Sequence, residues 1–300
     1  MIDIIITSYN EPKATLRAVN AFLNQKSTDN FRITVVDPFP EVGNFLKANI
    51  KSKKFNFYLD TGEGKGYALN ILFQEYHSKN KDDIFILTDG DVYVSPNALS
   101  EILNKFKDNR VGCVTGKPIA LESKDNKYQY WSYLAFKGIH RFRKNLAIKK
   151  KFFECSGYLF AIRKGVILDF PTQTSEDSII PYLFWKKGYL IDYADNAEVY
   201  VKNPGNWNDW LNQKVRNIKA HENLNKIAPD MHRTKSLFNE IKEGLFFAIK
   251  QPSNFKELIW AFQLYPARLY IYYKAFKEMK KRSYQDGWRE TEINSTKPMD

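Results

Sequence analysis

Cysteine is nearly absent from the chain: the two present, Cys113 and Cys155, lie far apart and match no metal-ligand spacing. We therefore expect two buried thiols in a reducing compartment rather than a disulfide framework or a zinc site. No run of about 18 apolar residues occurs, so no membrane-spanning helix is predicted. The first residues, MIDIIITSYN, show no basic segment and no cleavage site, so no secretory signal is visible. No internal repeat or low-complexity block is present.

The composition of the 300 residues is that of a globular protein, with 43% apolar and 15% aromatic residues. This length suits one large domain, or one domain with a substantial appendage. The net charge of +12 indicates a polyanionic partner, which can be a nucleic acid, anionic lipid head groups or a phosphate-bearing substrate.

Short apolar runs alternate with segments of helical spacing over the first hundred residues. The strand-like runs are residues 2–6, 33–36, 55–59 and 84–87, and the helix-like segments are residues 13–23, 42–49 and a helix opened by GEGKG at 62–66. This alternation predicts a mostly parallel sheet covered by helices on both faces. Ligands bind at the carboxyl ends of the strands in such sheets, and polar residues gather where these strands end.

Asp89 and Asp91 follow the buried run 84–87 directly, in the sequence TDGD. Two carboxylates this close repel each other unless a cation lies between them, and oxygen ligands suit Mg²⁺ or Mn²⁺. Two structural alternatives stand beside a metal site. Asp89-Gly90 can form a hairpin turn, and Asp91 can cap the helix expected after Pro96, although Ser95 is better placed for that.

Six short motifs occur in a fixed order: TSYNE at 7–11, VVD at 35–37, GKGYALN at 64–70, TDGD at 88–91, TSEDS at 174–178 and QKVRN at 213–217. Over about residues 1–220 the set resembles the family-2 glycosyltransferases with the GT-A fold. The resemblance implies a Rossmann-like, mostly parallel sheet flanked by helices. It also implies transfer of a sugar, with inversion, from a nucleotide-diphosphate donor to a hydroxyl of a glycan or lipid-linked acceptor. A UDP-sugar is the expected donor, and polysaccharide biosynthesis the expected process.

The resemblance assigns donor and metal contacts to individual residues. Asp89 and Asp91 become the DxD pair that holds Mn²⁺ or Mg²⁺, with Asp89 also at the donor. The predicted donor-binding residues are Thr7, Tyr9, Glu11, Asp37, Lys65, Asn70, Asp89, Gln213 and Arg216. Within this set the TSYNE segment packs on the nucleoside, Asp37 faces the base, and Lys65 lies near the phosphates or the base. Alternatives are a strand-ending turn at Asp37-Pro38 and a flexible surface turn around Lys65.

Glu176 and Asp177 form the second acidic pair. Inverting transfer needs a base that takes the proton of the attacking hydroxyl, and the family places this base at the second acidic residue. We therefore predict Asp177 as the general base, with Glu176 beside it in the catalytic set. The alternative is a helix start, since Ser175-Glu176-Asp177 also suits a cap with acids in the first turn.

Gln213 and Arg216 match the first part of a QxxRW motif, and an arginine fork suits a diphosphate. Asn217 occupies the place of the tryptophan, which puts processive polymerisation in doubt. An ordinary helix face is the alternative for this segment. His221 and His232 are candidates for a third metal ligand, although a lone histidine is more often a surface or capping residue.

The chain divides into a predicted catalytic domain, residues 1–220, and a helical, aromatic and basic extension, residues 221–300. Residues 258–282 are aromatic, interrupted by Pro266 and basic at the end, and residues 141–151 carry six cations. Both stretches suit peripheral attachment to the inner face of the cell membrane, without nucleic acid as a partner. A helix packed on the catalytic domain is the alternative for residues 258–282.

Three other classes of function remain open. A nucleic-acid-binding protein would explain the charge, but it would leave both acidic pairs unexplained. A nucleotidyltransferase also uses aspartates with Mg²⁺, but usually has a glycine-rich signature near its first strand. A processive polysaccharide synthase would normally carry spanning helices.

Overall fold

The apolar runs of the sequence form the central strands of one sheet in the computed structural model, which describes residues 1–26, 30–80, 82–172, 174–231, 244 and 247–280. The strands are β1 (Ile2–Thr7), β2 (Phe31–Asp37), β3 (Phe55–Leu59), β4 (Ile84–Asp89), β5 (Tyr93–Val94), β6 (Val111–Ala120), β7 (Leu159–Arg163) and β8 (Leu190–Val201). The helices are α1 (Pro12–Leu23), α2 (Pro40–Asn49), α3 (Lys65–Glu75), α4 (Ala98–Lys105), α5 (Lys127–Ile148), α6 (Glu176–Lys186), α7 (Trp207–Ile227) and α9 (Phe255–Met279).

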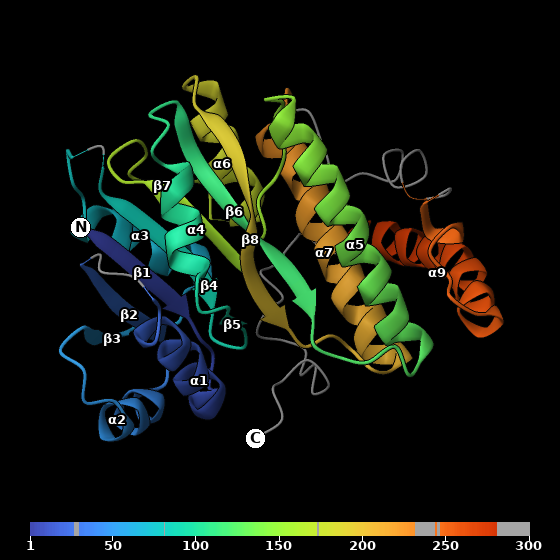
Figure 1. The fold of residues 1–300 in the computed structure, drawn as a ribbon, viewed down its shortest axis with the longest axis horizontal. Coiled ribbons are helices and arrows are strands. Elements are labelled where there is room, and N and C mark those ends of the chain that lie inside the picture. Colours follow the sequence, from blue (N-terminus) through green and yellow to red (C-terminus); the bar gives the residue numbers. More distant parts are fainter. Residues whose placement is uncertain (27–29, 81, 173, 232–243, 245–246, 281–300) are drawn as a thin grey trace.

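The strands lie in the order β3-β2-β1-β4-β7-β6-β8-β5. Strands β1 to β4 are parallel to one another, and β6 is parallel to β8. Strand β7 is antiparallel to both of its neighbours, and the short β5 is antiparallel to β8. The prediction of a mostly parallel sheet is confirmed, and the parallel half brings the carboxyl ends of β1, β2 and β4 to one edge (Figure 1).

Each face of the sheet carries its own apolar core. One core joins the sheet to α1, α2 and α4, and includes Phe22, Leu46 and Leu99. The other joins it to α3 and α6, and includes Phe73 and Phe184. Full burial of a Leu or Phe side chain stabilises a fold by about 1.5–3 kcal/mol, so these two layers hold the strand ends in place.

A third core lies between α5, α7 and α9, beside the sheet (Figure 1). Trp131 of α5 packs on Trp210 of α7, with ring centroids 4.7 Å apart, and its indole nitrogen donates to the Trp260 carbonyl of α9 at 2.6 Å. Helix α7 runs through residue 220 to Ile227, so the predicted domain boundary falls inside a helix. The division into two domains stays a prediction.

Strand β8 is continuous over twelve residues, with Ala194 and Ala197 buried at its middle. One segment differs from the sequence prediction. Pro266 does not interrupt its helix: it lies inside α9 on the exposed side, where water can satisfy the carbonyl that loses its partner.

Both cysteines are free and buried, as the sequence predicted, and burial raises the pKa of the Cys113 thiol. Among the helices of the described residues, none is both long enough and apolar enough to cross a bilayer.

Candidate active site

The carboxyl ends of β1 and β4 place Thr7 beside Asp89, since these two residues are register partners. The Thr7 hydroxyl donates to Asp89 Oδ1 at 3.2 Å and also approaches the Thr88 carbonyl at 3.3 Å. Asp89 is buried, with 6% of its surface exposed. A buried carboxylate is therefore fixed at the edge of the sheet where ligands of parallel sheets bind.

The TDGD segment forms neither a hairpin nor a helix cap. Strand β5 pairs with β8 instead of β4, and α4 begins after Asn97 without a side-chain cap bond. A Cβ atom at Gly90 would lie 2.8 Å from Thr15 Oγ1, so glycine allows the chain to pass close to α1. The chain turns at residues 90 and 91, but it forms no β4-β5 hairpin there, and Asp91 does not cap α4.

Asp91 points one carboxylate oxygen, Oδ1, into the protein without a hydrogen-bond partner. Burial, together with the nearby charges of Asp89 and Glu11, raises the pKa of Asp91 to about 8, against the opposing charge of Lys65. A buried carboxylate oxygen without a partner, near a second acid, is an arrangement that a bound cation would stabilise.

Lys65 connects the two acidic pairs of the sequence. Its Nζ lies 2.6 Å from Asp89 Oδ1 and 2.5 Å from Glu176 Oε1. Burial alone would lower the pKa of Lys65, but the two carboxylates raise it well above its ordinary value. Gly64, at φ +122°, makes the turn that begins α3 with this lysine. Lys65 is thus part of an ion-pair network, and the alternative prediction of a flexible surface turn around it is wrong.

Asp177 lies in the first turn of α6, next to Glu176. Its Oδ2 accepts from the Gly157 backbone N–H at 3.2 Å, and its Oδ1 accepts from the Ser175 hydroxyl. Ser175 is the N-cap residue but makes no side-chain cap bond to the helix, because its hydroxyl is used by Asp177. The helix start is real, and its serine orients the acid that the sequence assigned as base.

The predicted nucleoside end of the site is built around Asp37, which is fully buried. Its carboxylate accepts from the backbone N–H of Asn10 at 3.0 Å and of Phe39 at 2.8 Å. Burial raises the pKa of Asp37, whereas these hydrogen bonds lower it. Tyr9 packs its ring edge-on against Phe39, with centroids 5.2 Å apart. Asp37 thus joins the TSYNE segment to the start of α2.

Tyr158 is a member of the site that the sequence did not reveal. It precedes β7, and its carbonyl accepts from the Thr88 hydroxyl at 2.7 Å. Burial raises the pKa of Tyr158 above its ordinary value, the charges of Asp91 and Asp89 raise it further, and Arg216 lowers it. The phenol is therefore close enough to the acidic pair and to Arg216 of α7 for their charges to act on it. Only its place after Ser156-Gly157 could have signalled it.

Two predicted donor-binding residues, Asn70 and Gln213, have contacts within the protein. Asn70 exchanges two hydrogen bonds with the backbone of Phe170, at 2.9 and 3.0 Å, so it anchors the loop that leads to α6. Gln213 is buried and accepts from Lys214 at 3.1 Å. For both, a contact with the donor stays a prediction.

His221 faces Glu154, with Nδ1 3.6 Å from Oε2, and Glu154 also accepts from Ser178 at 2.8 Å. Among the described residues, no three Asp, Glu, His or Cys side chains converge as a metal site. A role of His221 as third metal ligand therefore stays a prediction. His232 lies outside the described residues.

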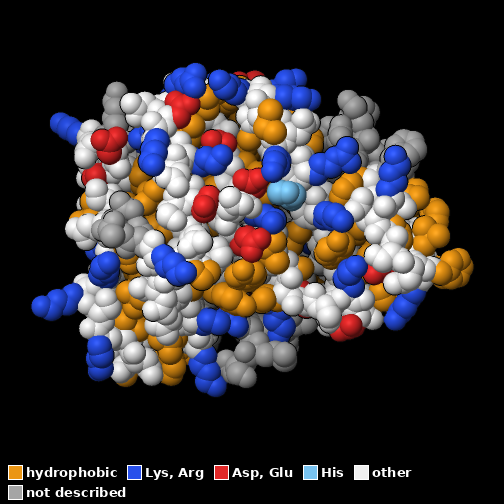
Figure 2. Space-filling model, in the orientation of Figure 1, with side chains coloured by type: hydrophobic (Ala, Val, Ile, Leu, Met, Phe, Trp, Pro, Cys, Tyr) orange, Lys and Arg blue, Asp and Glu red, His pale blue; other side chains and the backbone are white. Residues whose placement is uncertain are grey.

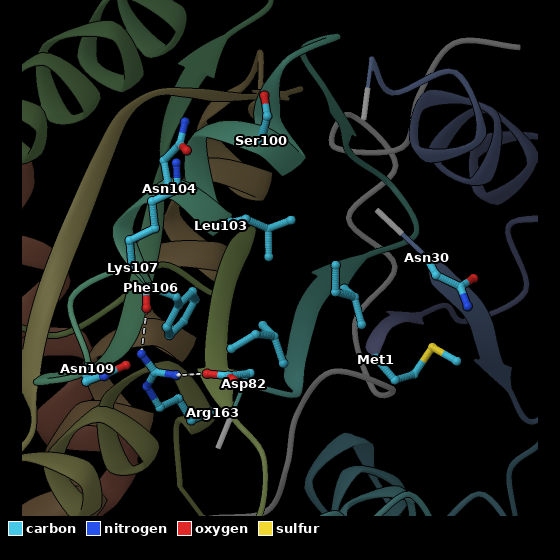
Figure 3. A pocket seen from close by; sticks show the side chains of 12 residues that line it. Met1, Asn30, Asp82, Ser100, Leu103, Asn104, Phe106, Lys107, Asn109 and Arg163 are labelled. Atoms are coloured by element: carbon cyan, nitrogen blue, oxygen red, sulfur yellow. Dashed lines mark hydrogen bonds and ion pairs between the residues drawn. The ribbon is translucent and has the colours of Figure 1, made fainter. Parts of the chain in front are cut away.

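A cavity of about 840 Å³ lies at the opposite edge of the sheet, where β1 and β4 begin (Figure 3). Its buried cation, Arg163, donates to the Phe106 carbonyl at 2.7 Å and to the Val111 carbonyl at 2.8 Å, and lies 3.9 Å from Asp82. These contacts hold the loop after α4. The cavity does not touch the acidic pairs, and we assign it no catalytic role.

The raised pKa of Asp91 should make the stability of the metal-free protein depend on pH. Because its folded-state pKa is raised from 3.8 to about 8, the folded protein holds a proton that the unfolded chain releases. The free energy of unfolding in EDTA should therefore fall as the pH rises from about 4 to about 8, through this group. Thermal unfolding of the wild type and of Asp91→Asn, compared across this range, measures the contribution. Identical pH slopes in the two proteins would contradict it.

The acidic pair fits a divalent cation. Asp89 and Asp91 offer hard oxygen ligands, Asp91 has an oxygen without a protein partner, and Lys65 already supplies positive charge to Asp89. Residues that would hold Mn²⁺ or Mg²⁺ are therefore present.

Comparison with known proteins agrees with this geometry. The family model of glycosyl transferase family 2 matches residues 3–169. No protein of curated function is significantly similar in sequence. Among solved structures, the mannosyltransferase PcManGT from Pyrobaculum calidifontis, in complex with GDP-Man and Mn²⁺, superimposes with a TM-score of 0.58 at 16% identity, over 93% of this chain and 80% of that one.

A second structure, GalNAc-T7 with UDP, GalNAc and Mn²⁺, gives a TM-score of 0.51 at 17% identity, over 74% of this chain and 47% of that one. At these identities the two structures support the fold alone. The family model covers more than half of the chain, including β1 to β4, β7, Asp89 and Asp91. The chain therefore belongs to glycosyl transferase family 2 and is a glycosyltransferase of the GT-A type.

Proposed function

We propose that the enzyme transfers a sugar from a nucleoside-diphosphate donor to a hydroxyl group of a glycan or lipid-linked acceptor. A UDP-sugar is the donor that we favour. The observation that carries this proposal is the buried carboxylate oxygen Asp91 Oδ1, which has no hydrogen-bond partner, near Asp89 and the ion pair of Asp89 with Lys65. A dense negative charge such as a diphosphate cannot bind to two acids unaided. A divalent cation held by them would neutralise the diphosphate and stabilise the departing nucleotide.

Donor binding is assigned to the residues around this pair. Thr7 holds Asp89, and Lys65 stands within reach of both acidic pairs. Asp37 is assigned to the base end of the donor, where it holds the TSYNE segment through Asn10 N–H. When a donor enters, the Lys65 ammonium can exchange a carboxylate for a phosphate oxygen. Arg216, near the Tyr158 hydroxyl, adds a second cation on the side of α7. PcManGT was solved with GDP-Man and GalNAc-T7 with UDP, so a test of donor binding should include both guanosine and uridine nucleotides.

The chemical step is a single displacement with inversion. The acceptor oxygen forms a bond to the anomeric carbon while the bond from that carbon to the diphosphate oxygen breaks, and the nucleoside diphosphate leaves with the electron pair. Asp177 takes the hydroxyl proton, and its carboxylate is held for this by Gly157 N–H and the Ser175 hydroxyl. Glu176 acts indirectly, because its Oε1 lies 2.5 Å from Lys65 Nζ and holds that lysine in place.

The acceptor is proposed to be presented at the inner face of the cell membrane, in polysaccharide biosynthesis. Asn217, which is exposed on α7, stands where the QxxRW motif has tryptophan, and this argues against processive polymerisation. A nucleotidyltransferase is set aside by the family assignment.

A donor screen tests the proposal. The enzyme is incubated with Mn²⁺ and a panel of UDP-, GDP- and dTDP-sugars, and the released nucleoside diphosphate is measured. We expect release from one nucleotide class, faster with acceptor present and stopped by EDTA. Release that is unchanged in EDTA, or no release from any donor, would contradict the proposal.

A further inference from the structure

The outward face of α9 carries a regular line of apolar side chains. They are Phe255, Ile259, Phe262, Leu269, Tyr273 and Phe276, named here the outer stripe. With Pro266 between them, their spacing alternates between four and three residues, which keeps them on one side of the helix. Every member is exposed, from 42% for Ile259 to 75% for Phe255.

The opposite face of α9 fixes this orientation. Ala261, Ile271 and Ala275 are fully buried in the core shared with α5 and α7. Trp260 is also on this side, where its ring meets Tyr130 at 5.9 Å and its carbonyl accepts from Trp131. The outer stripe therefore cannot turn inward without breaking this core. At about 1.5 Å per residue, the helix presents it over roughly 35 Å.

Positive charge surrounds the outer stripe. The described residues 247–280 hold six Lys or Arg and two Glu. Both glutamates are occupied by lysines of other elements: Glu257 by Lys124 at 3.0 Å and Glu278 by Lys219 at 3.2 Å. Figure 2 shows the apolar side chains at the right-hand end of the molecule, where α9 lies in Figure 1, with Lys and Arg at their margin.

Lysines and tyrosines also meet in a groove on this helix. It has a volume of about 270 Å³ and is lined by Tyr270, Tyr273, Lys274, Lys277 and Glu278. Lys277 lies 5.8 Å from the centre of the Tyr273 ring. A cationic groove bordered by phenols suits a phosphate at the depth where tyrosine rings sit in a membrane interface.

A second copy of the chain would be a poor occupant. Two α9 helices packed stripe to stripe would bring the lysines of both copies together, while the two glutamates of each helix are already paired with lysines of their own copy. An anionic lipid surface meets the same cations with opposite charge. We propose that the outer stripe of α9 lies in the interface of an anionic bilayer, with the lysines at its margin on the head groups. Membrane binding by the outer stripe does not depend on the proposed function. Only the statement that the membrane presents the acceptor rests on it.

The structure changes which residues carry membrane contact compared with the sequence prediction. Within the basic run 141–151, Arg143 is buried and donates to the carbonyls of Glu154 and Cys155, and Lys144 pairs with Asp195 at 2.7 Å. These two cations are therefore not available to a membrane. Trp260, an aromatic residue of the predicted contact, belongs to the core.

Vesicle flotation tests the proposal with the full chain. Wild type is mixed with neutral phosphatidylcholine vesicles, or with vesicles containing phosphatidylglycerol, at low and high salt. The apolar variant is Phe262→Ser/Leu269→Ser. Its control is Leu59→Ser/Leu168→Ser, which removes two leucines of similar exposure from other elements. The charge variant is Lys256→Gln/Lys274→Gln/Lys277→Gln, with Lys47→Gln/Lys51→Gln/Lys53→Gln as its control. Far-UV circular dichroism checks that each variant is folded.

We expect wild type to float with anionic vesicles at low salt and to keep a fraction bound at high salt. The apolar variant should lose at least about tenfold in partitioning for each side chain removed. The charge variant should lose about fivefold per lysine at low salt. Both controls should bind like wild type.

A wild type that does not bind anionic vesicles, or equal losses in the variants and their controls, would overturn the proposal. A dimer in sedimentation that the apolar variant abolishes would overturn it in favour of a second copy. Flotation needs neither metal nor nucleotide. Its failure therefore leaves the proposed transferase activity standing, and failure of the donor screen leaves the membrane surface standing.

Discussion

Replacing Asp91 with alanine is expected to abolish sugar transfer while leaving the metal-free protein at least as stable as wild type. The carboxylate has an oxygen without a protein partner and is destabilised by burial and by Asp89. Its removal therefore relieves repulsion. Transfer should disappear because the variant loses one of two metal ligands. Even outer partners of metal ligands cost about 10–100-fold in affinity, so a ligand itself should cost more.

Turnover and thermal unfolding of Asp91→Ala, both measured with Mn²⁺ and with EDTA, check this pair of effects. Asp82→Ala is the control, since it removes an exposed acid at the opposite edge of the sheet. Mn²⁺ should raise the unfolding temperature of wild type and of the control but not of Asp91→Ala. A variant that transfers sugar at the wild-type rate, or that is stabilised by Mn²⁺ like wild type, would exclude Asp91 as a ligand.

Asp177→Asn is expected to lower turnover by about 10²–10⁴-fold while donor binding is retained, the loss typical for a positioned general base. The amide can still accept the hydrogen bond from Gly157 N–H, so the start of α6 should keep its geometry. It cannot take the proton of the acceptor hydroxyl at neutral pH.

The control for this variant is Asp169→Asn, an exposed acid in the loop before α6 with the same change of charge. Turnover and nucleotide affinity are measured for both, together with Glu176→Gln. Near-normal turnover of folded Asp177→Asn would reject the base assignment. If only Glu176→Gln were slow, the base would be Glu176, and its contact with Lys65 would need to open during the reaction.

The core elements could be predicted because their sequence patterns are strong. The buried runs of β1 to β4 and the helices between them follow from apolar periodicity, and the strand ends follow from the topology of parallel sheets. Asp89, Asp91, Glu176 and Asp177 could be placed because they stand in ordered motifs at these ends. The ion pairs of Lys65 with Asp89 and Glu176 could not, since they join three separate elements.

The remaining features depend on packing that no local pattern records. Tyr158 enters the site because β7 inserts between β4 and β6, antiparallel to both. The direction in which His221 points depends on the buried Glu154. From the sequence, the aromatic stretch 258–282 could be either a helix packed on the domain or a helix at a membrane. In the structure, one face of α9 is buried and the other carries exposed apolar side chains. Which face is buried depends on where α5 and α7 lie.

Calorimetric titration of UDP and GDP into the wild-type enzyme, with Mn²⁺ and then with EDTA, tests the central claim most directly. If Asp89 and Asp91 hold a cation that binds the donor diphosphate, one nucleotide should bind in Mn²⁺ and lose most of its affinity in EDTA. Equal affinity for that nucleotide in Mn²⁺ and in EDTA would contradict the metal-dependent donor site.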